Sequence, residues 1–374
     1  MTSIDNENLE VNKTTKPSKG KRKKKKTNPL LVILLVLLCI VVAGFVTWRI
    51  LNAQGKKSLY GNAESTGPEL ESLQPAEDAA QAESDPTWQR GWVRYGDDIY
   101  QYNEDILTFL VMGIDKSSEV EVVADGIMGG QADLIILAVM DPHKKTTSLI
   151  TINRNTMTEI DVYDENGQYL GSGKGQLCLQ HGYGDGADLS CERMEKAVSN
   201  LFYKLPIHGY FSINMGAIKD INAAVGGVTL TLDEDFVTDK GVYLTKGTHT
   251  LTDEQAYMYI RYRNRDEFDS ATDRLNREKK YIAAFVSNLK EKTAKDLTVP
   301  IKIFNKLSPY IVTDISTSDL TYLVSNAYDY KFDTEKIYSL KGTTAIGVTE
   351  HEEFTYDPDQ LYDLIINIFY EKVE

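Results

Sequence analysis

The sequence predicts an α/β domain with a mixed central β-sheet sandwiched between α-helices, preceded by one transmembrane helix. Two continuous apolar runs, 106–113 and 133–140, are typical of strands that are buried on both faces. Amphipathic helical patterns and short strands alternate irregularly over the second half of the chain. Near the N-terminus, residues 30–48 form an apolar stretch without a single charge.

The charge of the chain changes sign across this apolar stretch. The first 30 residues hold nine Lys and Arg against three acids, whereas the remainder has a net charge of −20. A helix over 30–48 is long enough for the ~30 Å hydrocarbon core of a bilayer. Because the lysine run precedes it, we expect the N-terminus in the cytoplasm and the domain outside.

Two alternatives fit the N-terminus less well. A cleaved signal peptide has a shorter apolar run and a small-residue cleavage site. The second alternative is that "KGKRKKKK" binds nucleic acid. The membrane span beside this run already explains its lysines, so we expect no nucleic-acid partner. The prediction is therefore a basic cytoplasmic tail (1–28), a transmembrane helix (29–51), an acidic flexible linker (52–98) and an extracellular catalytic domain (99–374).

Turn and cap signals predict the order of elements within the domain. The run 146–153 follows a five-residue turn and should pair antiparallel with 133–140. Asn166-Gly167 predicts a further hairpin. Five helices are expected later: one capped by Ser190, one ended by Gly226-Gly227, one opened by the capping box of Thr252 and Gln255, and amphipathic helices over 274–290 and 357–372.

Cys178 and Cys191 lie thirteen residues apart in the expected domain. An oxidising compartment would permit a disulfide between them. Two reduced, buried thiols are the alternative, and the spacing leaves both open.

Carboxylates and arginines are the candidates for chemistry. Asp115 ends the first buried strand and Asp133 begins the second, at strand ends where α/β folds collect ligands. Taken alone, each is better explained as an ordinary turn or cap residue. Together they offer the hard oxygen ligands that suit Mg²⁺.

Five arginines follow at strand or helix ends. Arg154 closes the third strand, Arg261 and Arg263 end the capped helix, and Arg274 and Arg277 open the next one. Guanidinium groups repel one another unless an anion joins them, and their forked donors match phosphate or pyrophosphate. The alternative is a solvated face of salt bridges with neighbouring acids, which the charge count does not exclude.

The order "GID…ADLIILAVMDPHKKTTSLITINRNT…INAAVGGVTLTL…LTDEQAYMYIRYR…DRLNREKKY" resembles the LytR–CpsA–Psr family of Gram-positive bacteria, membrane-anchored enzymes of cell wall biogenesis. The resemblance implies a transferase that moves a teichoic acid or capsular polysaccharide from a polyprenyl-pyrophosphate carrier to the C6 hydroxyl of N-acetylmuramic acid in peptidoglycan. It further implies that an isoprenoid tail lies between the sheet and the helices.

The resemblance also implies roles for the candidate residues. Asp115 and Asp133 would hold Mg²⁺, with one of them a candidate for the base, and Arg154 would support catalysis. Pyrophosphate would be bound by four further arginines: Arg261, Arg263, Arg274 and Arg277.

Three positions depart from the family pattern. The family usually has aspartate where this chain has Asn155, aspartate where it has Ala271, and glutamine where it has Glu278. Asp269 or Asp273 is a candidate replacement for the aspartate that is missing at Ala271. These departures keep two other functions open: a non-catalytic polyprenyl-pyrophosphate binder or regulator of the cell envelope, and a pyrophosphatase that uses the same site.

Overall fold

The computed structural model describes residues 29–62, 67–70, 88–264, 266–348 and 350–373, without the side chains of 29–41, 62, 334 and 335. Two compact units result, Met1–Trp48 and Arg49–Glu374. The second unit contains all the strands of the described chain.

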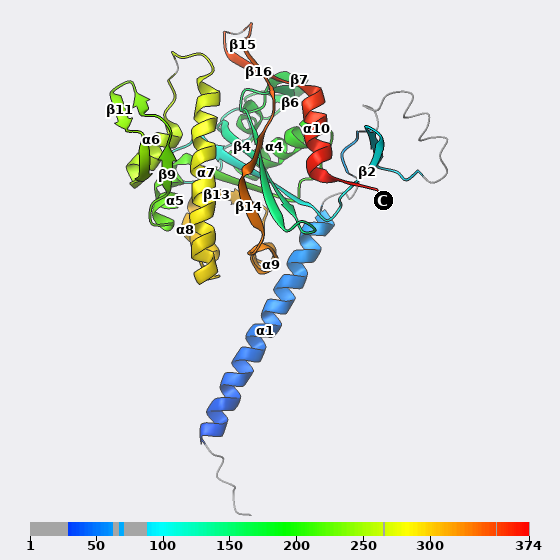
Figure 1. The fold of residues 1–374 in the computed structure, drawn as a ribbon, viewed down its shortest axis with the longest axis vertical. Coiled ribbons are helices and arrows are strands. Elements are labelled where there is room, and N and C mark those ends of the chain that lie inside the picture. Colours follow the sequence, from blue (N-terminus) through cyan, green and yellow to red (C-terminus); the bar gives the residue numbers. More distant parts are fainter. Residues whose placement is uncertain (1–28, 63–66, 71–87, 265, 349, 374) are drawn as a thin grey trace, which may run out of the picture. The chain divides into compact units, whose positions relative to one another are not determined.

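A six-stranded mixed sheet forms the centre of this unit, in the order β13-β8-β3-β4-β5-β14 (Figure 1). Its strands are β3 (Leu107–Ile114), β4 (Ala132–Asp141), β5 (Thr146–Ile152), β8 (Tyr210–Asn214), β13 (Ile311–Thr313) and β14 (Lys331–Ser339). β3, β4 and β5 are consecutive antiparallel neighbours, whereas β8 pairs parallel with β3 and β14 parallel with β5. The predicted strands and the predicted antiparallel pairing of the third strand are confirmed.

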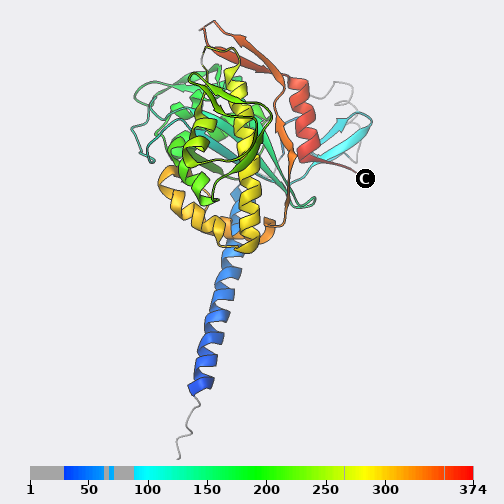
Figure 2. The same cartoon turned by 60° about the vertical axis from the view of Figure 1, so that its left-hand side comes forward.

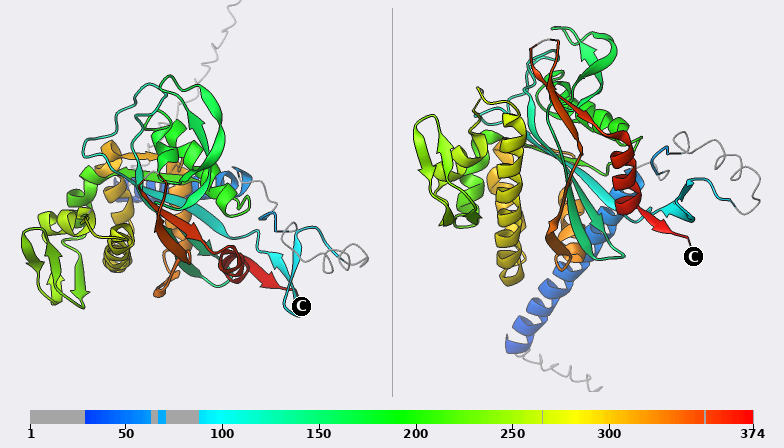
Figure 3. Two further views of the ribbon diagram at one scale, coloured as in Figure 1. Left: turned by 90° about the horizontal axis from the view of Figure 1, so that it is seen from above. Right: turned by 45° about the horizontal axis from the view of Figure 1, so that its top comes forward.

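Helices lie on both sides of the sheet, as the sequence predicts. They are α3 (Leu179–Gly182), α4 (Asp188–Leu201), α5 (Ile218–Ala224), α6 (Asp253–Arg261), α7 (Ser270–Lys295), α8 (Val299–Leu307), α9 (Thr317–Ala327) and α10 (Pro358–Phe369). Figure 3 shows α7 and α10 on opposite sides of the sheet.

The main core fills the face covered by α4 and α10. Leu110 and Met112 of β3 alternate toward this side and pack in one cluster with Met194 of α4 and Ile365 of α10, all fully buried. The period of two along the strand and the apolar stripes of both helices explain why these residues meet.

The other face carries α7, α8 and α9. The ammonium group of Lys279 on α7 donates to Ser339 Oγ on β14 at 2.9 Å. The ring of Phe304 on α8 lies 6.5 Å from that of Phe211 on β8. These contacts place α7 and α8 over the sheet.

A second, smaller core lies beside the sandwich and holds α5 and α6 in place. Thr252 forms the predicted capping box with Gln255 and begins α6. Gly226 and Gly227, with φ of +76° and +90°, end α5 as predicted, because left-handed backbone is accessible to glycine without a steric cost.

Short two- and three-stranded sheets complete the domain. They are β1 (Trp92–Tyr95), β2 (Asp98–Tyr102) and β17 (Tyr370–Lys372), β6 (Met157–Tyr163) with β7 (Tyr169–Gln176), β9 (Thr229–Leu232) with β12 (Gly247–Thr250), β10 (Phe236–Thr238) with β11 (Gly241–Leu244), and β15 (Gly342–Ile346) with β16 (Glu352–Tyr356). The β6–β7 pair is the hairpin predicted from Asn166-Gly167. The β15–β16 hairpin and α9 lie at opposite ends of the domain (Figures 1 and 2).

The boundary between anchor, linker and domain differs from the prediction. Helix α1 (Pro29–Asn62) continues eleven residues past the expected span, and β1 begins inside the expected linker. Leu59 is buried against Leu107 and Phe109. The domain therefore begins earlier than residue 99, while the linker prediction for 71–87 lies outside the described residues, as does the tail 1–28.

The transmembrane prediction is not tested by the structure. Among the residues whose side chains are described, no helix is both long enough and apolar enough to span a bilayer. Residues 29–41, which make up most of the predicted span, lie outside that set.

Replacing Leu59 with alanine should destabilise the domain, because Leu59 is 2% exposed and the change opens a cavity beside β3. We expect a loss of about 2–4 kcal/mol in the free energy of unfolding, measured on the full chain in detergent. Lys57→Ala, on the same helix but exposed, is the control and should change stability little. Equal stability of both variants would contradict the packing of residues 55–62 on the domain.

Candidate functional site

Asp133 lies at the centre of a buried cluster of charges at one end of the sheet. The Arg154 guanidinium donates to Asp133 Oδ1, and Arg274 Nη1 donates to Oδ2 at 2.8 Å. Asp133 is 5% exposed and Arg274 is 6% exposed. The carboxylate thus joins the end of β5 to the start of α7, segments far apart in the sequence.

A second ion pair lies next to the first. Arg261 lies at the end of α6, and its Nη2 donates to Asp115 Oδ1 at 2.7 Å. Asp115 directly follows β3. Gln131 links the two pairs, because its backbone oxygen accepts from the Asp115 N–H at 3.0 Å and its side chain accepts from Arg154. Both predicted carboxylates and these three arginines are therefore brought together.

Arg263 lies at the same end of the domain and contacts Glu352, a residue with no predicted role. Its Nη2 donates to Glu352 Oε2 at 2.7 Å, and the same oxygen accepts from Asn155 Nδ2 at 3.2 Å. Asn155 is one of the departures from the family pattern. Glu352, the first residue of β16, supplies a carboxylate beside it.

Arg277 differs from the other predicted pyrophosphate ligands. Its Nε donates to the backbone oxygen of Tyr259 at 3.1 Å, its Nη2 donates to that of Tyr262, and its guanidinium lies 5.3 Å from the Phe236 ring. These contacts hold the carboxyl end of α6, which carries Arg261. Arg277 is therefore placed to position the arginines rather than to grip a ligand itself.

Asp269, a candidate replacement for the missing aspartate at Ala271, is engaged elsewhere. Its Oδ1 accepts from the hydroxyls of Thr272 at 2.6 Å and Thr344 at 2.8 Å. The contact ties the start of α7 to the β15–β16 hairpin.

Glu278 is buried directly behind the cluster. It is 2% exposed, and its Oε1 lies 3.6 Å from Arg274 Nε. Neither carboxylate oxygen accepts a hydrogen bond from the residues that the structure describes. Burial raises the pKa of Glu278 to about 8, although Arg274 opposes that shift. At neutral pH the side chain is therefore mostly a neutral acid.

The two cysteines are free thiols, so the disulfide alternative is wrong for this structure. Cys178 Sγ lies 3.0 Å from Arg154 Nη2, and Cys191 Sγ lies 3.9 Å from His181 Nε2. Burial raises the pKa of Cys178 and raises that of Cys191 to about 12. Each sulfur therefore has a separate neighbour, the Arg154 guanidinium for Cys178 and the His181 imidazole for Cys191.

The donor set at this site is compatible with a magnesium ion. Asp115 and Asp133 supply two hard carboxylates next to an amide oxygen of Gln131. Among the described residues there is no group of three or more His, Cys, Asp and Glu that could enclose a metal. Mg²⁺ suits such an open set, because it keeps waters and shares phosphate oxygens of a substrate.

Fold and site together define an α/β sandwich in which arginines and carboxylates meet at one end of the central sheet. The LytR_cpsA_psr family matches residues 71–362. The chain belongs to this family.

Known proteins with similar sequence or structure agree with this assignment. The polyisoprenyl-teichoic acid–peptidoglycan teichoic acid transferase TagU of Enterococcus faecalis is 30% identical over 64% of this chain and 72% of its own length. The structure of protein gbs0355 from Streptococcus agalactiae aligns with a TM-score of 0.57 at 23% identity, over 70% of this chain and 86% of that one. The structure of TagT bound to LI-WTA aligns with a TM-score of 0.52 at 22% identity, over 74% and 92%. At these identities, the structural likeness shows the fold.

Replacing Glu278 with glutamine should remove the contribution of this residue to the pH dependence of the free energy of unfolding between about pH 5 and 8. The folded-state pKa is raised from 4.5 to about 8, so between these values only the folded state holds the proton. The wild-type free energy of unfolding should therefore fall as pH rises through this window. At pH 8, E278Q should be more stable by about 1–3 kcal/mol.

Denaturation at pH 6 and pH 9 measures this difference. Glu291→Gln on the same helix is the matched control, because Glu291 is 72% exposed and paired with Lys295 at the surface. If E278Q and wild type lose stability equally with rising pH, Glu278 is not the buried acid described above.

Proposed function

We propose that this chain is a phosphotransferase that moves a teichoic acid or a related wall glycopolymer from a polyprenyl-pyrophosphate carrier to the C6 hydroxyl of N-acetylmuramic acid in peptidoglycan. One observation carries the proposal: Arg154, Arg261 and Arg274 meet two carboxylates at one end of the sheet. Membership of the family and the teichoic acid transferase activity named for TagU support it.

The exposed side of the cluster would bind the diphosphate. The side chain of Arg261 is 30% exposed and that of Arg154 is 13% exposed, so both are reachable from solvent, whereas Arg274 lies deeper. Guanidinium forks bind phosphate oxygens in a bidentate manner and stabilise the negative charge that develops on transfer. Asp115 and Asp133 would hold Mg²⁺, which adds positive charge against the diphosphate oxygens when bound.

The reaction is an in-line displacement at phosphorus. The C6 oxygen forms a bond to the phosphorus that bears the glycan. The bond from that phosphorus to the bridging oxygen breaks, and polyprenyl phosphate leaves with the electron pair. Asp115 is the better candidate to accept the hydroxyl proton, because its side chain is 41% exposed whereas that of Asp133 is 3% exposed.

The isoprenoid tail would lie between the sheet and α7–α8. Four apolar side chains on this face, from β3, β8 and α8, are only partly buried: Val111, Phe211, Ile213 and Phe304. Incompletely packed apolar surface between layers is the kind of lining that an alkyl chain can fill.

Residues 29–51 would anchor the chain as a single-pass helix, with the catalytic domain outside the cell. The uncharged run 30–48 and the preceding lysines support this address. A carrier lipid and a wall acceptor are both accessible there.

Arg154→Ala and Arg274→Ala should each lower the transfer rate by about 10²-fold or more, because each removes a donor to the developing charge. The assay uses the full chain in detergent with a synthetic polyprenyl-pyrophosphate-linked glycan and a peptidoglycan acceptor. Arg274→Lys tests the buried position with the charge kept, and Arg90→Ala, an exposed arginine, is the control. Wild-type rates for both alanine variants would refute the assignment.

Chelation should abolish transfer and added Mg²⁺ should restore it. Asp115→Asn should raise the Mg²⁺ concentration needed for half-maximal rate by at least about tenfold, because one of two carboxylates is lost, and should also lower the maximal rate, because the proton acceptor is lost. Glu254→Asn, an exposed acid on α6, is the control. Activity that is indifferent to both chelator and metal would remove Asp115 and Asp133 from a metal site.

The products distinguish the alternatives. A transferase consumes the carrier-linked glycan only when acceptor is present and forms a glycan–peptidoglycan conjugate. Release of glycan phosphate without acceptor, at the same rate, would indicate a pyrophosphatase. Tight retention of intact donor without turnover would indicate a binder.

A further inference from the structure

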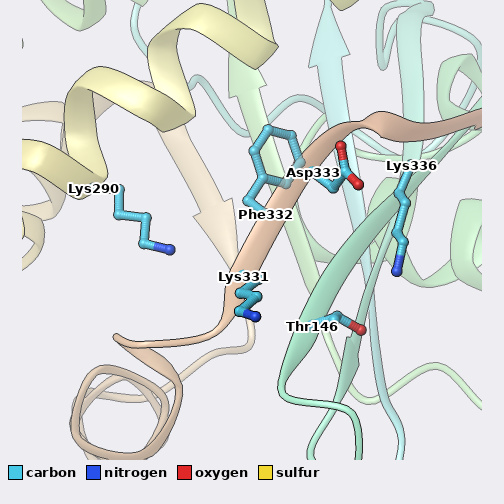
Figure 4. A pocket seen from close by; sticks show the side chains of 6 residues that line it. All are labelled: Thr146, Lys290, Lys331, Phe332, Asp333 and Lys336. Carbon is cyan, nitrogen blue, oxygen red and sulfur yellow. The ribbon is translucent and has the colours of Figure 1, made fainter.

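A groove lined by lysines lies at the opposite end of the sheet from the arginine cluster. It has a volume of about 420 Å³ and is lined by Thr146, Lys290, Lys331, Phe332, Asp333 and Lys336. Figure 4 shows Lys290 on α7 reaching toward β14, from which Lys331 and Lys336 extend. Three ammonium groups against one carboxylate make this lining positive, in a chain whose residues after 30 carry a net −20.

The local geometry explains how the groove forms. β14 pairs with β5 from Lys331 to Phe332 and again from Ile337, with a register shift between them. The intervening residues therefore bulge from the edge of the sheet. Across the gap, Lys290 Nζ donates to the Tyr330 backbone oxygen at 2.8 Å and is held at the rim.

The groove gathers more lysines than acids, unlike the surface next to it. Lys144 and Lys145 are each paired with an acid, Asp141 at 2.9 Å and Asp329 at 3.7 Å. The residues that line the groove include three lysines and one acid, Asp333. An excess of ammonium groups over carboxylates around a cavity favours an anionic ligand.

The position of the groove indicates where that anion would come from. From Thr146 to Arg154, β5 and the residues after it cover about 25 Å at ~3.3 Å per residue, so the groove is remote from the arginine cluster. At the groove end, Tyr60 of α1 contacts Tyr322 of α9 with ring centroids 6.3 Å apart, and its hydroxyl donates to the Asp105 backbone oxygen. Residues 55–60, which follow the proposed anchor, thus attach to the domain at this end.

We propose that the groove between α7 and β14 binds the phosphate headgroup of an anionic lipid and so docks the domain on the membrane surface. This inference rests on the proposed membrane anchor. The groove opens between α7 and the sheet, so a bound headgroup would also lie at the end of the layer proposed for the isoprenoid tail.

Lysine acylation followed by mass spectrometry tests the proposal on the full chain in nanodiscs. Discs of phosphatidylcholine alone are compared with discs of equal phosphatidylcholine and phosphatidylglycerol. Lys290, Lys331 and Lys336 should react about fivefold more slowly in the anionic discs, the ratio that corresponds to ~1 kcal/mol per lysine at an anionic surface. Lys174 and Lys240, exposed and remote from the groove, should react equally in both.

Two double variants and inorganic phosphate serve as controls for this experiment. In the double variant K331Q/K336Q, protection of Lys290 by the anionic discs should be lost, whereas K174Q/K240Q should retain it. Unchanged reactivity of the groove lysines between the two discs would overturn the proposal. Protection by millimolar inorganic phosphate in phosphatidylcholine discs, without protection by phosphatidylglycerol, would overturn the lipid source and assign the groove to a soluble phosphate.

Failure of the anchor is distinguishable from failure of the groove. A chain without an anchor would separate from the discs on size exclusion, whereas an anchored chain with unprotected lysines would contradict the groove alone.

Discussion

The buried carboxylate of Asp133, shared by Arg154 and Arg274, is the interaction on which this end of the molecule depends. A charge at 5% exposure is tolerable only when paired and hydrogen-bonded, and two guanidinium groups meet that need here. The pairing determines where α7 begins relative to β4 and β5. It also holds two positive groups close together, which an isolated pair of arginines would resist.

The departures from the family pattern make sense around this constraint. Where an aspartate is expected after Arg154, Asn155 instead shares Glu352 with Arg263, so a carboxylate is supplied from a distant hairpin. Glu278 adds an acid behind Arg274 where a neutral amide is usual, and burial keeps that acid largely protonated at neutral pH. The net charge around the arginines is therefore less negative than the residue count implies.

The two ends of the sheet have different chemistry. One end gathers carboxylates and arginines from β3, β4, β5, α6 and α7, and the other presents lysines at a bulged edge strand. The proposed transfer chemistry and the proposed contact with lipid headgroups are separated by the length of the sheet, with partly buried apolar side chains between them.

Sequence signals were sufficient for the local structure. Apolar runs, a capping box and glycine pairs were sufficient for the strands, for α6 and for the end of α5, because these signals act over a few residues. Their positions at strand ends were sufficient to identify Asp115, Asp133 and Arg154 as candidate site residues. The family resemblance, read from the same motifs, is confirmed.

Which side chains meet depends on the packing of distant segments. Glu352 joins Arg263 across 89 residues, Arg277 binds backbone oxygens instead of facing the carboxylates, and the two cysteines lie apart as thiols. The continuation of α1 to Asn62 depends on burying Leu59 against β3. Such pairings depend on long-range packing, and a spacing along the chain carries no information about them.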